Sequence, residues 1–324
     1  MTLIAAGSVA LAAGLDRLLA EPPAALHPVA WLGRGLAPLD RTWTTPRLAG
    51  VGVALTVPLV AAAVAAGGVA IASRLGPLAG GVAAAVVCFT CTSRRMLLDE
   101  ARAVVAASGA DLPAARERLR ALAGRDATAL SAGEVRSAAV ESAAENLADG
   151  LVAPLAGFAL LAPLSLPLAA AAAAWVKAVN TLDSTFGYRS HPMGWAPARL
   201  DDLVMWVPAR ASAVLLAVAG GNPGALRAAR PLARRPTSPN AGWPMATLAV
   251  VLGVCLTKPG AYRLDGGAEA DGALPTPADA DRGVVVVARA GWLAFGLAAT
   301  VAVVGGSALA GTAGSSLPVV IPPC

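Results

Sequence analysis

The chain is poor in the residues from which soluble enzymes build reactive centres. Its 324 residues include 2 histidines, 4 cysteines and only 14% charged side chains, whereas 56% are hydrophobic. The mean hydropathy is +0.65. A soluble domain usually carries about 25% charged residues and a smaller apolar share. The composition therefore excludes an ordinary soluble domain and predicts an all-α, polytopic integral membrane protein.

The scarcity of cysteine and histidine argues against several kinds of site. Cys88 and Cys91 form a C-x-x-C in an apolar run, but no second pair accompanies them, so packing residues are expected rather than zinc or iron–sulfur ligands. His27 and His191 each precede a proline, which is typical of turns, and a Ser-His-Asp triad is not expected. The sequence also lacks a Walker-type phosphate loop and a Rossmann glycine motif, so a nucleotide would have to be held by other means.

Lysine is almost absent, since Lys177 and Lys258 are the only two. The net charge of +5 therefore rests on arginine. Arginine favours planar, bidentate contacts with carboxylate or phosphate, which would suit an anionic, phosphorylated ligand. A high-GC coding bias toward alanine, arginine and glycine would produce the same enrichment, so both explanations stay open.

Seven apolar runs are candidates for membrane helices, and a crossing needs about 20 apolar residues. They lie near residues 2–15, 49–72, 77–92, 151–179, 203–219, 241–256 and 284–311. The second, fourth and last are comfortably long enough, and the others are short or buried. The first run lacks a basic start and is not followed by a recognisable cleavage site, so a retained first helix is expected. We predict a single membrane domain over 1–324.

Two segments between the apolar runs are polar. Residues 93–150 place apolar side chains at helical spacing and contain eight arginines, which predicts an amphipathic helical insert on the cytoplasmic side. Asp111 followed by Pro113 predicts a helix start within it. Residues 257–283 contain paired glycines and two prolines and are predicted to be a flexible loop.

A first group of carboxylates lies just before the apolar run 151–179. Glu141, Glu145 and Asp149 are spaced by four, which stacks three carboxylates on one helix face. Ionisable groups near lipid cost roughly 2.5 to 3.5 kcal/mol each on insertion scales, so their retention points to a use. Oxygen ligands of this kind suit Mg2+, although an ordinary solvated helix face would show the same spacing.

A second polar group follows the same apolar run. Lys177, Asn180 and Asp183 share one side of a helix end, where the lysine is either a snorkelling anchor or a ligand for phosphate or carboxylate. Asp201 and Asp202 precede another apolar run, and one of them can cap its helix. Capping does not explain both.

The length of the intervening run decides whether the two groups can meet. As one helix, residues 151–179 would be roughly 43 Å long, whereas a hydrocarbon core is about 30 Å thick. Pro163 and Pro167 lie near its middle and break the hydrogen-bond ladder. We therefore predict a fold-back that returns both groups to one side, with a single crossing as the alternative.

The polar sequence motifs resemble those of the adenosylcobinamide-phosphate synthase family of cobalamin biosynthesis. The resemblance covers roughly residues 10–260 in order. The motifs that carry the resemblance are Asp16 to Gly33, Gly124-Arg125-Asp126, Glu141-Ser142 with Glu145-Asn146 and Asp149-Gly150, Asn180 to Ser184, Gly187-Tyr188, Ala198 to Asp202, Pro208-Ala209-Arg210 and Ser238 to Pro244. Two departures are a glutamate at Glu21 where the family usually has aspartate, and a shortened region around 187–194 that leaves the role of His191 in doubt.

The resemblance implies an amide-forming C–N ligase that joins (R)-1-amino-2-propanol, or its O-phosphate, to a propionate carboxyl of adenosylcobyric acid, using ATP and Mg2+. The predicted metal ligands are Glu145, Asp149, Asp183, Asp201 and Asp202. Catalysis is assigned to Glu145, Asp183 and Asp202. Substrate binding is assigned to His27, Arg125, Asn146, Lys177, Asn180, Ser184, Arg199, Arg210 and Asn240.

The expected setting is the bacterial inner membrane, crossed several times, with the lipid bilayer, the corrinoid and the amine as partners and no nucleic acid. Two other classes remain open. A transporter would place a polar site at broken helices near the midplane, and a non-catalytic membrane sensor could use the same scaffold. A transporter should place its ionisable residues inside the spans and in paired repeats. Here they lie mostly at span ends, and no internal repeat is found.

Overall fold

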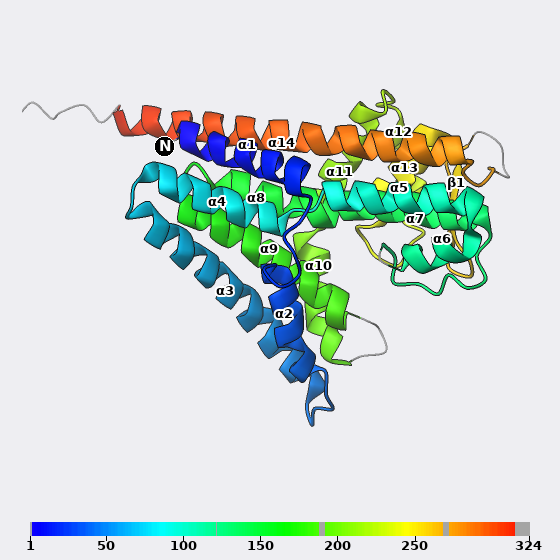
Figure 1. Ribbon diagram of the computed structural model, residues 1–324, viewed down its shortest axis with the longest axis horizontal. Coiled ribbons are helices and arrows are strands. Elements are labelled where there is room, and N and C mark those ends of the chain that lie inside the picture. The colour runs from blue at the N-terminus through cyan, green and yellow to red at the C-terminus, as the bar shows by residue number, and fades with distance from the viewer. Residues whose placement is uncertain (1, 121, 188–191, 268–271, 315–324) are drawn as a thin grey trace, which may run out of the picture.

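The computed structural model describes residues 2–120, 122–187, 192–267 and 272–314, with side chains to 307, and helices dominate them (Figure 1). This confirms the predicted all-α class. Five helices pack together in what we call the membrane half. They are α1 (Thr2–Leu19), α3 (Pro46–Ser73), α4 (Pro77–Cys91), α8 (Ala153–Leu161) and α9 (Leu166–Phe186).

The outer surface of the membrane half is apolar. On α3 the side chains of Leu55, Leu59 and Val64 are exposed by 59%, 61% and 70%. Leu78 and Val82 continue this surface on α4. A water-soluble protein rarely exposes so large an apolar area, so these side chains face lipid.

Several helical segments can cross a membrane. Within the described residues, five are long and apolar enough, and a sixth results if α10 (Trp195–Val204) and α11 (Trp206–Ala219), bent by 48°, form one span. The five are Thr2–Leu19, Pro46–Ser73, Pro77–Ala110, Ala132–Leu161 and Pro277–Ser307. The chain is therefore polytopic, as its composition predicts. Two runs that the sequence marks as short or buried, 2–15 and 77–92, lie in such segments.

The apolar run 151–179 folds back on itself. α8 ends at Leu161, a turn follows, and α9 begins at Leu166 with Ser165 as its N-cap. The two helices pack side by side, so closely that a Cβ on Gly157 would lie 3.4 Å from the backbone of Ala172 (Figure 1). The predicted fold-back is confirmed. Pro163 lies in the turn and Pro167 in the first turn of α9, where proline does not interrupt a helix.

The other end of the molecule, which we call the polar half, contains shorter helices and a hairpin (Figure 1). Its elements are α5 (Arg95–Ala110), α6 (Leu112–Leu119), α7 (Ala132–Leu147), α12 (Ala225–Leu232), α13 (Gly242–Leu252), β1 (Cys255–Lys258) and β2 (Tyr262–Asp265). The predicted insert 93–150 contains the first three. Asp111 caps α6 by accepting from the amide of Ala114 at 3.0 Å, as its sequence position predicts.

The predicted loop 257–283 is wrong in part. β1 and β2 pair antiparallel, with Lys258 opposite Tyr262, and Gly260 turns between them at a φ of 72°. The long helix α14 (Pro277–Gly314) already begins within this segment. A Pro-Gly turn between two short runs is a hairpin signal, which outweighs the loop-like glycine content.

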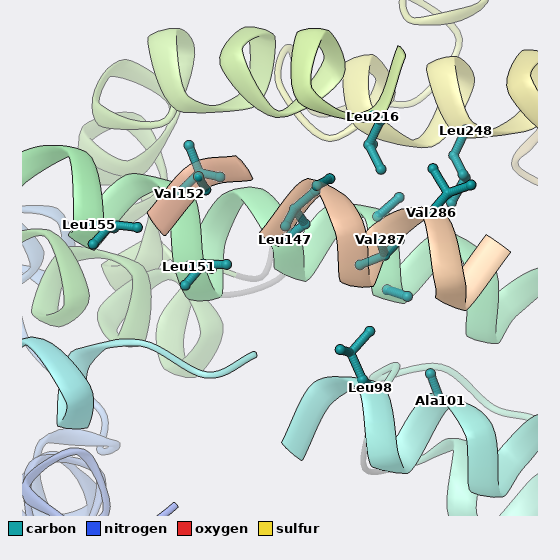
Figure 2. Close-up of a cluster of buried hydrophobic side chains, with 14 of the residues drawn as sticks. Leu98, Ala101, Leu147, Leu151, Val152, Leu155, Leu216, Leu248, Val286 and Val287 are labelled. Atoms are coloured by element: carbon teal, nitrogen blue, oxygen red, sulfur yellow. The ribbon is translucent and has the colours of Figure 1, made fainter. Parts of the chain in front are cut away.

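α14 runs along both halves, and a shared apolar core joins them (Figures 1 and 2). Leu98 of α5, Leu147 of α7 and Leu151 are buried together with Leu216 of α11 and Val287 of α14 (Figure 2). Full burial of one such side chain contributes about 1.5 to 3 kcal/mol. The core therefore fixes α5, α7 and α11 relative to the lipid-facing helices, at the level where the polar groups meet.

Candidate functional site

The two polar groups meet where the membrane and polar halves join. The carboxylate of Asp149 interacts electrostatically with those of Asp201, Glu145 and Asp183, and with the ammonium of Lys177. These five residues come from three separate segments of the chain. The fold-back of α8 and α9 is what places the first group beside the second.

A local irregularity positions Asp149. α7 continues into a π-helical turn, η2 (Ala148–Val152), before α8 begins. The carbonyl of Gly150 in this turn accepts a hydrogen bond from the amide of Ser93 at 2.8 Å. Such π turns are rare and occur frequently at functional sites, because they widen the helix and redirect a side chain. Here the turn also ties the site to the junction between α4 and α5.

α9 and α10 supply the second group. The side chain of Asn180 hydrogen bonds to Asp201, and the charge of Asp183 interacts with that of Asp202. Ser184 instead donates to the carbonyl of Asn180 at 2.9 Å. The predicted capping role of Asp201 or Asp202 is wrong, because both lie inside α10 and α11 has no side-chain cap.

The charge balance of this cluster is uneven. Four carboxylates, those of Glu145, Asp149, Asp183 and Asp201, influence one another. Lys177 is the basic residue that acts on Asp149. The Oδ1 atom of Asp201 is buried and has no hydrogen-bond partner. These carboxylates are half-buried, and like charges held close together with one unpartnered oxygen are unfavourable, so a cation there would offset their repulsion.

Arg199 and Arg210 border the cluster. Arg199 lies 3.5 Å from the carboxylate of Asp202 and is largely exposed. The guanidinium of Arg210 stacks on the rings of Trp206 and Trp243, 4.2 and 5.2 Å from their centroids. Stacking of this kind fixes the plane of a guanidinium. The Nη1 atom of Arg210 also donates to the carbonyl of Trp206 at 2.7 Å, and its Nη2 atom to that of Pro239 at 3.5 Å.

Asn240 connects Arg210 to the cluster. Its Oδ1 accepts from Arg210 at 3.0 Å, and its Nδ2 donates to the backbone carbonyl of Asp202 at 2.7 Å. Asn240 is 5% exposed. A buried amide with both ends bonded is a rigid link, so Arg210 and α10 are held in a fixed relation.

Glu141 is the first of the three carboxylates spaced by four along the chain, and both of its oxygens have hydrogen-bond partners. Its carboxylate accepts from Arg125 at 2.7 Å, from the Tyr262 hydroxyl at 3.1 Å and from Ser137 at 3.3 Å. Burial lowers the pKa of Arg125, but Glu141 outweighs burial and the net pKa is raised. Burial and the Glu141 charge both raise the pKa of Tyr262. Because its guanidinium is committed to Glu141, substrate binding by Arg125 stays a prediction.

A polar cavity of about 540 Å3 adjoins the cluster. Asn146, Lys177 and His27, three of the residues predicted to bind substrate, line it. The Nδ1 atom of His27 accepts from the amide of Val29 at 3.2 Å and caps α2 (Pro28–Leu36). Burial lowers the pKa of His27, with Lys177 acting in the same direction and Glu21 opposing both.

Several residues at this cavity are absent from the sequence prediction. Glu21, Thr92 and Ser93 line it, and the Oγ atom of Ser93 is buried without a partner. Asp16 supports this wall, because its Oδ1 accepts from the amides of Arg94 and Arg95 at 2.9 and 3.0 Å and so caps α5. The criterion of polar residues at the end of an apolar run would have found Thr92 and Ser93.

The described residues contain no preformed group of three or more acidic, histidine or cysteine side chains that could hold a metal ion by themselves. His191 lies outside the described residues, so its role stays open. Mg2+ is commonly held by one or two carboxylates together with substrate phosphates, so a full cage is not required for it.

A bundle of lipid-facing helices with a carboxylate cluster beside a polar cavity defines a polytopic α-helical membrane protein. Comparison with known proteins makes this specific. Residues 9–287 match the family described as CobD/Cbib protein, so the chain belongs to that family. It is therefore a protein of cobalamin biosynthesis.

Curated relatives agree with the family match. A cobalamin biosynthesis protein CobD of Geobacter metallireducens is 40% identical over 266 residues, covering 78% of this chain and 81% of the relative. The corresponding protein of Rhodobacter capsulatus is 38% identical over 306 residues, covering 88% and 93%. A probable CobD of Methanothrix thermoacetophila is 34% identical over 304 residues, covering 89% and 94%. No solved structure matches the chain.

Proposed function

We propose that this protein forms the amide bond between (R)-1-amino-2-propanol, or its O-phosphate, and a propionate carboxyl of adenosylcobyric acid, at the expense of ATP. The observation that carries the proposal is the meeting of Glu145, Asp149, Asp183 and Asp201 beside a polar cavity, with Lys177 acting on Asp149. Family membership and the order of the polar motifs along the chain support it. Such a site could gather several anions and neutralise the charge that develops between them.

The chemistry requires two transfers. A carboxylate is a poor acyl donor, so one of its oxygens would attack the γ-phosphorus of ATP, giving an acyl phosphate and ADP. The amine would then attack the acyl carbon, the carbon–oxygen bond to phosphate would break, and the ammonium proton would pass to a base. Lys177, Arg199 and Arg210 are assigned to the phosphates. Glu145, Asp183 and Asp202 are the candidates for the base.

The carboxylate cluster fits the Mg2+ that this reaction requires. The unpartnered Oδ1 of Asp201 is a buried hard-oxygen donor, and the neighbouring carboxylates repel one another without a cation. One or two of Asp149, Asp183 and Asp201 would hold the ion together with phosphate oxygens, with Glu145 and Asp202 at the edge of the set. When bound, the ion would neutralise phosphate charge. Asn146, Asn180 and Ser184 would orient the acyl group or the amine.

The proposed setting is the bacterial inner membrane, with α5, α6 and α7 on the cytoplasmic side. The arginines of the 93–150 segment support this orientation, because positive residues favour the cytoplasmic face. On this side ATP and the corrinoid would reach the site from water, while α3 and α4 remain in lipid.

The test uses the purified full-length protein in nanodiscs with adenosylcobyric acid, Mg-ATP and either amine. Mass spectrometry should show a product heavier by the amine minus water, with ADP released in equal amount. Asp149→Asn should abolish the product, whereas Asp281→Asn, an exposed aspartate at the start of α14, should not. Absence of the amide with both amines would refute the proposed reaction.

A further inference from the structure

A second cavity, of about 830 Å3, lies beside the polar one and is almost entirely apolar. We call it the α3–α4 groove. Its walls come from α3 and α4, its floor from α9, and one end is closed by α2. Figure 1 shows why it exists: α3 and α4 meet at a tight turn and diverge away from it. Its volume is that of an ordinary ligand pocket, about 300 to 1,000 Å3.

The groove opens onto the lipid-facing surface. Its rim includes Val60 and Val64 of α3 and Val86 of α4, whose side chains are exposed. Leu59 of α3 and Val82 of α4, which lie outside the groove, continue the same apolar surface. The surrounding medium is therefore hydrocarbon, and the bilayer is what covers the opening.

Away from Lys177, the hydroxyl and indole groups among the described residues that line the groove are already bonded within the protein. The hydroxyls of Thr56 and Thr90 already donate to backbone carbonyls of their own helices, at 2.7 and 3.1 Å. The indole N–H of Trp31 donates to the carbonyl of Ala25 at 2.8 Å. Among the described residues that line the groove, Lys177 is the one with a charge. A dry, roomy groove of this kind favours an apolar chain.

One end of the groove is polar. Val29, Thr90 and Lys177 line both the groove and the polar cavity, so the two spaces adjoin there. A ligand that fills the groove therefore needs a long apolar part and an anionic group at one end. The molecule of the surrounding bilayer with this chemistry is a phospholipid, whose phosphate lies at the membrane boundary.

We propose that the α3–α4 groove binds one acyl chain of a membrane phospholipid whose phosphate contacts Lys177. This site shares Lys177 with the carboxylate cluster and otherwise lies outside it. Because the proposed reaction also uses Lys177 for phosphate, the occupancy of the groove is measured without the substrates of that reaction. The lipid would close the polar cavity toward the bilayer and leave it open toward water.

Two neighbouring glycines of α3 provide a matched test. Gly68 lines the groove and Gly67 does not, and an added Cβ at either position meets no atom within 4 Å. Gly68→Leu should therefore fill the groove without a clash, while Gly67→Leu makes the same change outside it. Gly35→Leu and Gly33→Leu form an equivalent pair on α2, since only Gly35 lines the groove.

The readout is the phospholipid retained by the full-length protein after detergent purification, counted by native mass spectrometry without substrates. Wild type, Gly67→Leu and Gly33→Leu should retain one phospholipid. Gly68→Leu and Gly35→Leu should lower its retention about tenfold, because the added side chain occupies the acyl-chain space. Equal retention in both members of each pair would overturn the proposal, as would a change in oligomeric state with unchanged lipid content.

A second experiment tests the contact between the lipid phosphate and Lys177. Wild-type protein offered a phospholipid and a diacylglycerol with the same chains should retain the phospholipid preferentially, and Lys177→Met should reduce that preference. Equal retention of the two lipids by wild type would overturn the assignment of Lys177. Amide-forming activity is not used, so failure here is distinguishable from failure of the proposed reaction.

Discussion

Glu141 and Asp149 lie two helical turns apart on one continuous helical segment, yet their surroundings are opposite. Glu141 is fully buried and bonded to Arg125, Tyr262 and Ser137. Asp149 lies in the π-helical turn, where its nearest charges include three other carboxylates. Equal spacing along a helix therefore does not imply an equal role.

We interpret the difference as one of role: Glu141 stabilises the fold, whereas the fold positions Asp149 for function. Glu141 ties α7 to the loop before it and to β2, so it joins parts of the polar half. Among the described residues, the Asp149 cluster has no comparable set of donors, and under the proposed function a bound cation would offset the repulsion between its carboxylates. Natural proteins accept such unfavourable charge clusters at functional sites.

The largest expected effect comes from removing a carboxylate of the Asp149 cluster. Asp149→Asn or Asp201→Asn should lower turnover by about 10² to 10³-fold, because a half-buried carboxylate assigned to the cation is lost from the reacting centre. Turnover is measured by amide formation in nanodiscs. The thermal midpoint should stay level or rise, since mutual repulsion falls. Wild-type turnover in both variants would remove these residues from the site.

The next largest effect comes from removing the charge of Glu141, which should lower the stability of the protein. Glu141→Gln should destabilise the protein by about 3 to 5 kcal/mol, because Arg125 is left buried without a counter-charge. Thermal unfolding in detergent measures this, and the double variant Glu141→Gln with Arg125→Met should recover part of the loss. If the single variant unfolds like wild type but loses turnover, Glu141 belongs with Asp149 instead.

Adding Mg2+ should distinguish the two ends directly. At about 100 times its dissociation constant, a ligand that binds only the folded state stabilises it by about 2.7 kcal/mol. The thermal midpoint of wild type and of Asp281→Asn should therefore rise with Mg2+ and fall again with a chelator. Asp149→Asn should respond weakly. An unchanged response in the Asp149→Asn and Asp201→Asn double variant would place the cation elsewhere.

Much of the site's assembly follows from local features of the sequence. The excess length of 151–179 and its two prolines predict the fold-back, and the fold-back alone brings Asp149 near Asp183. The N-cap of α6 at Asp111 is likewise local. These features are predictable because each depends on residues a few positions apart.

The pairing of Glu141 is not local. Arg125 and Tyr262 lie 16 and 121 positions away. Their contacts depend on the loop before α7 and on the β1–β2 hairpin, whose strand β1 packs against α7. Spacing along α7 cannot reveal this, so the sequence treats Glu141, Glu145 and Asp149 alike. The α3–α4 groove is hidden for the same reason, since it depends on the angle between two helices.

The smallest expected effect concerns His27, which lines the cavity as Asn146 does but has a structural bond as Glu141 does. Its pKa is lowered by burial, so the folded state binds fewer protons than the unfolded state below pH 6.5. Stability from the neutral ring is present above that pH and is lost as the pH falls toward the folded-state pKa.

Protonation also removes the Nδ1 lone pair that caps α2, a loss of about 1 kcal/mol. The thermal midpoint should therefore fall slightly between pH 7 and pH 5. His27→Asn, which can cap without titrating, should flatten this part of the profile. An identical slope in His27→Asn would assign the pH dependence to other groups, and a large loss of turnover at pH 7 would move His27 from the structural side of the comparison to the functional one.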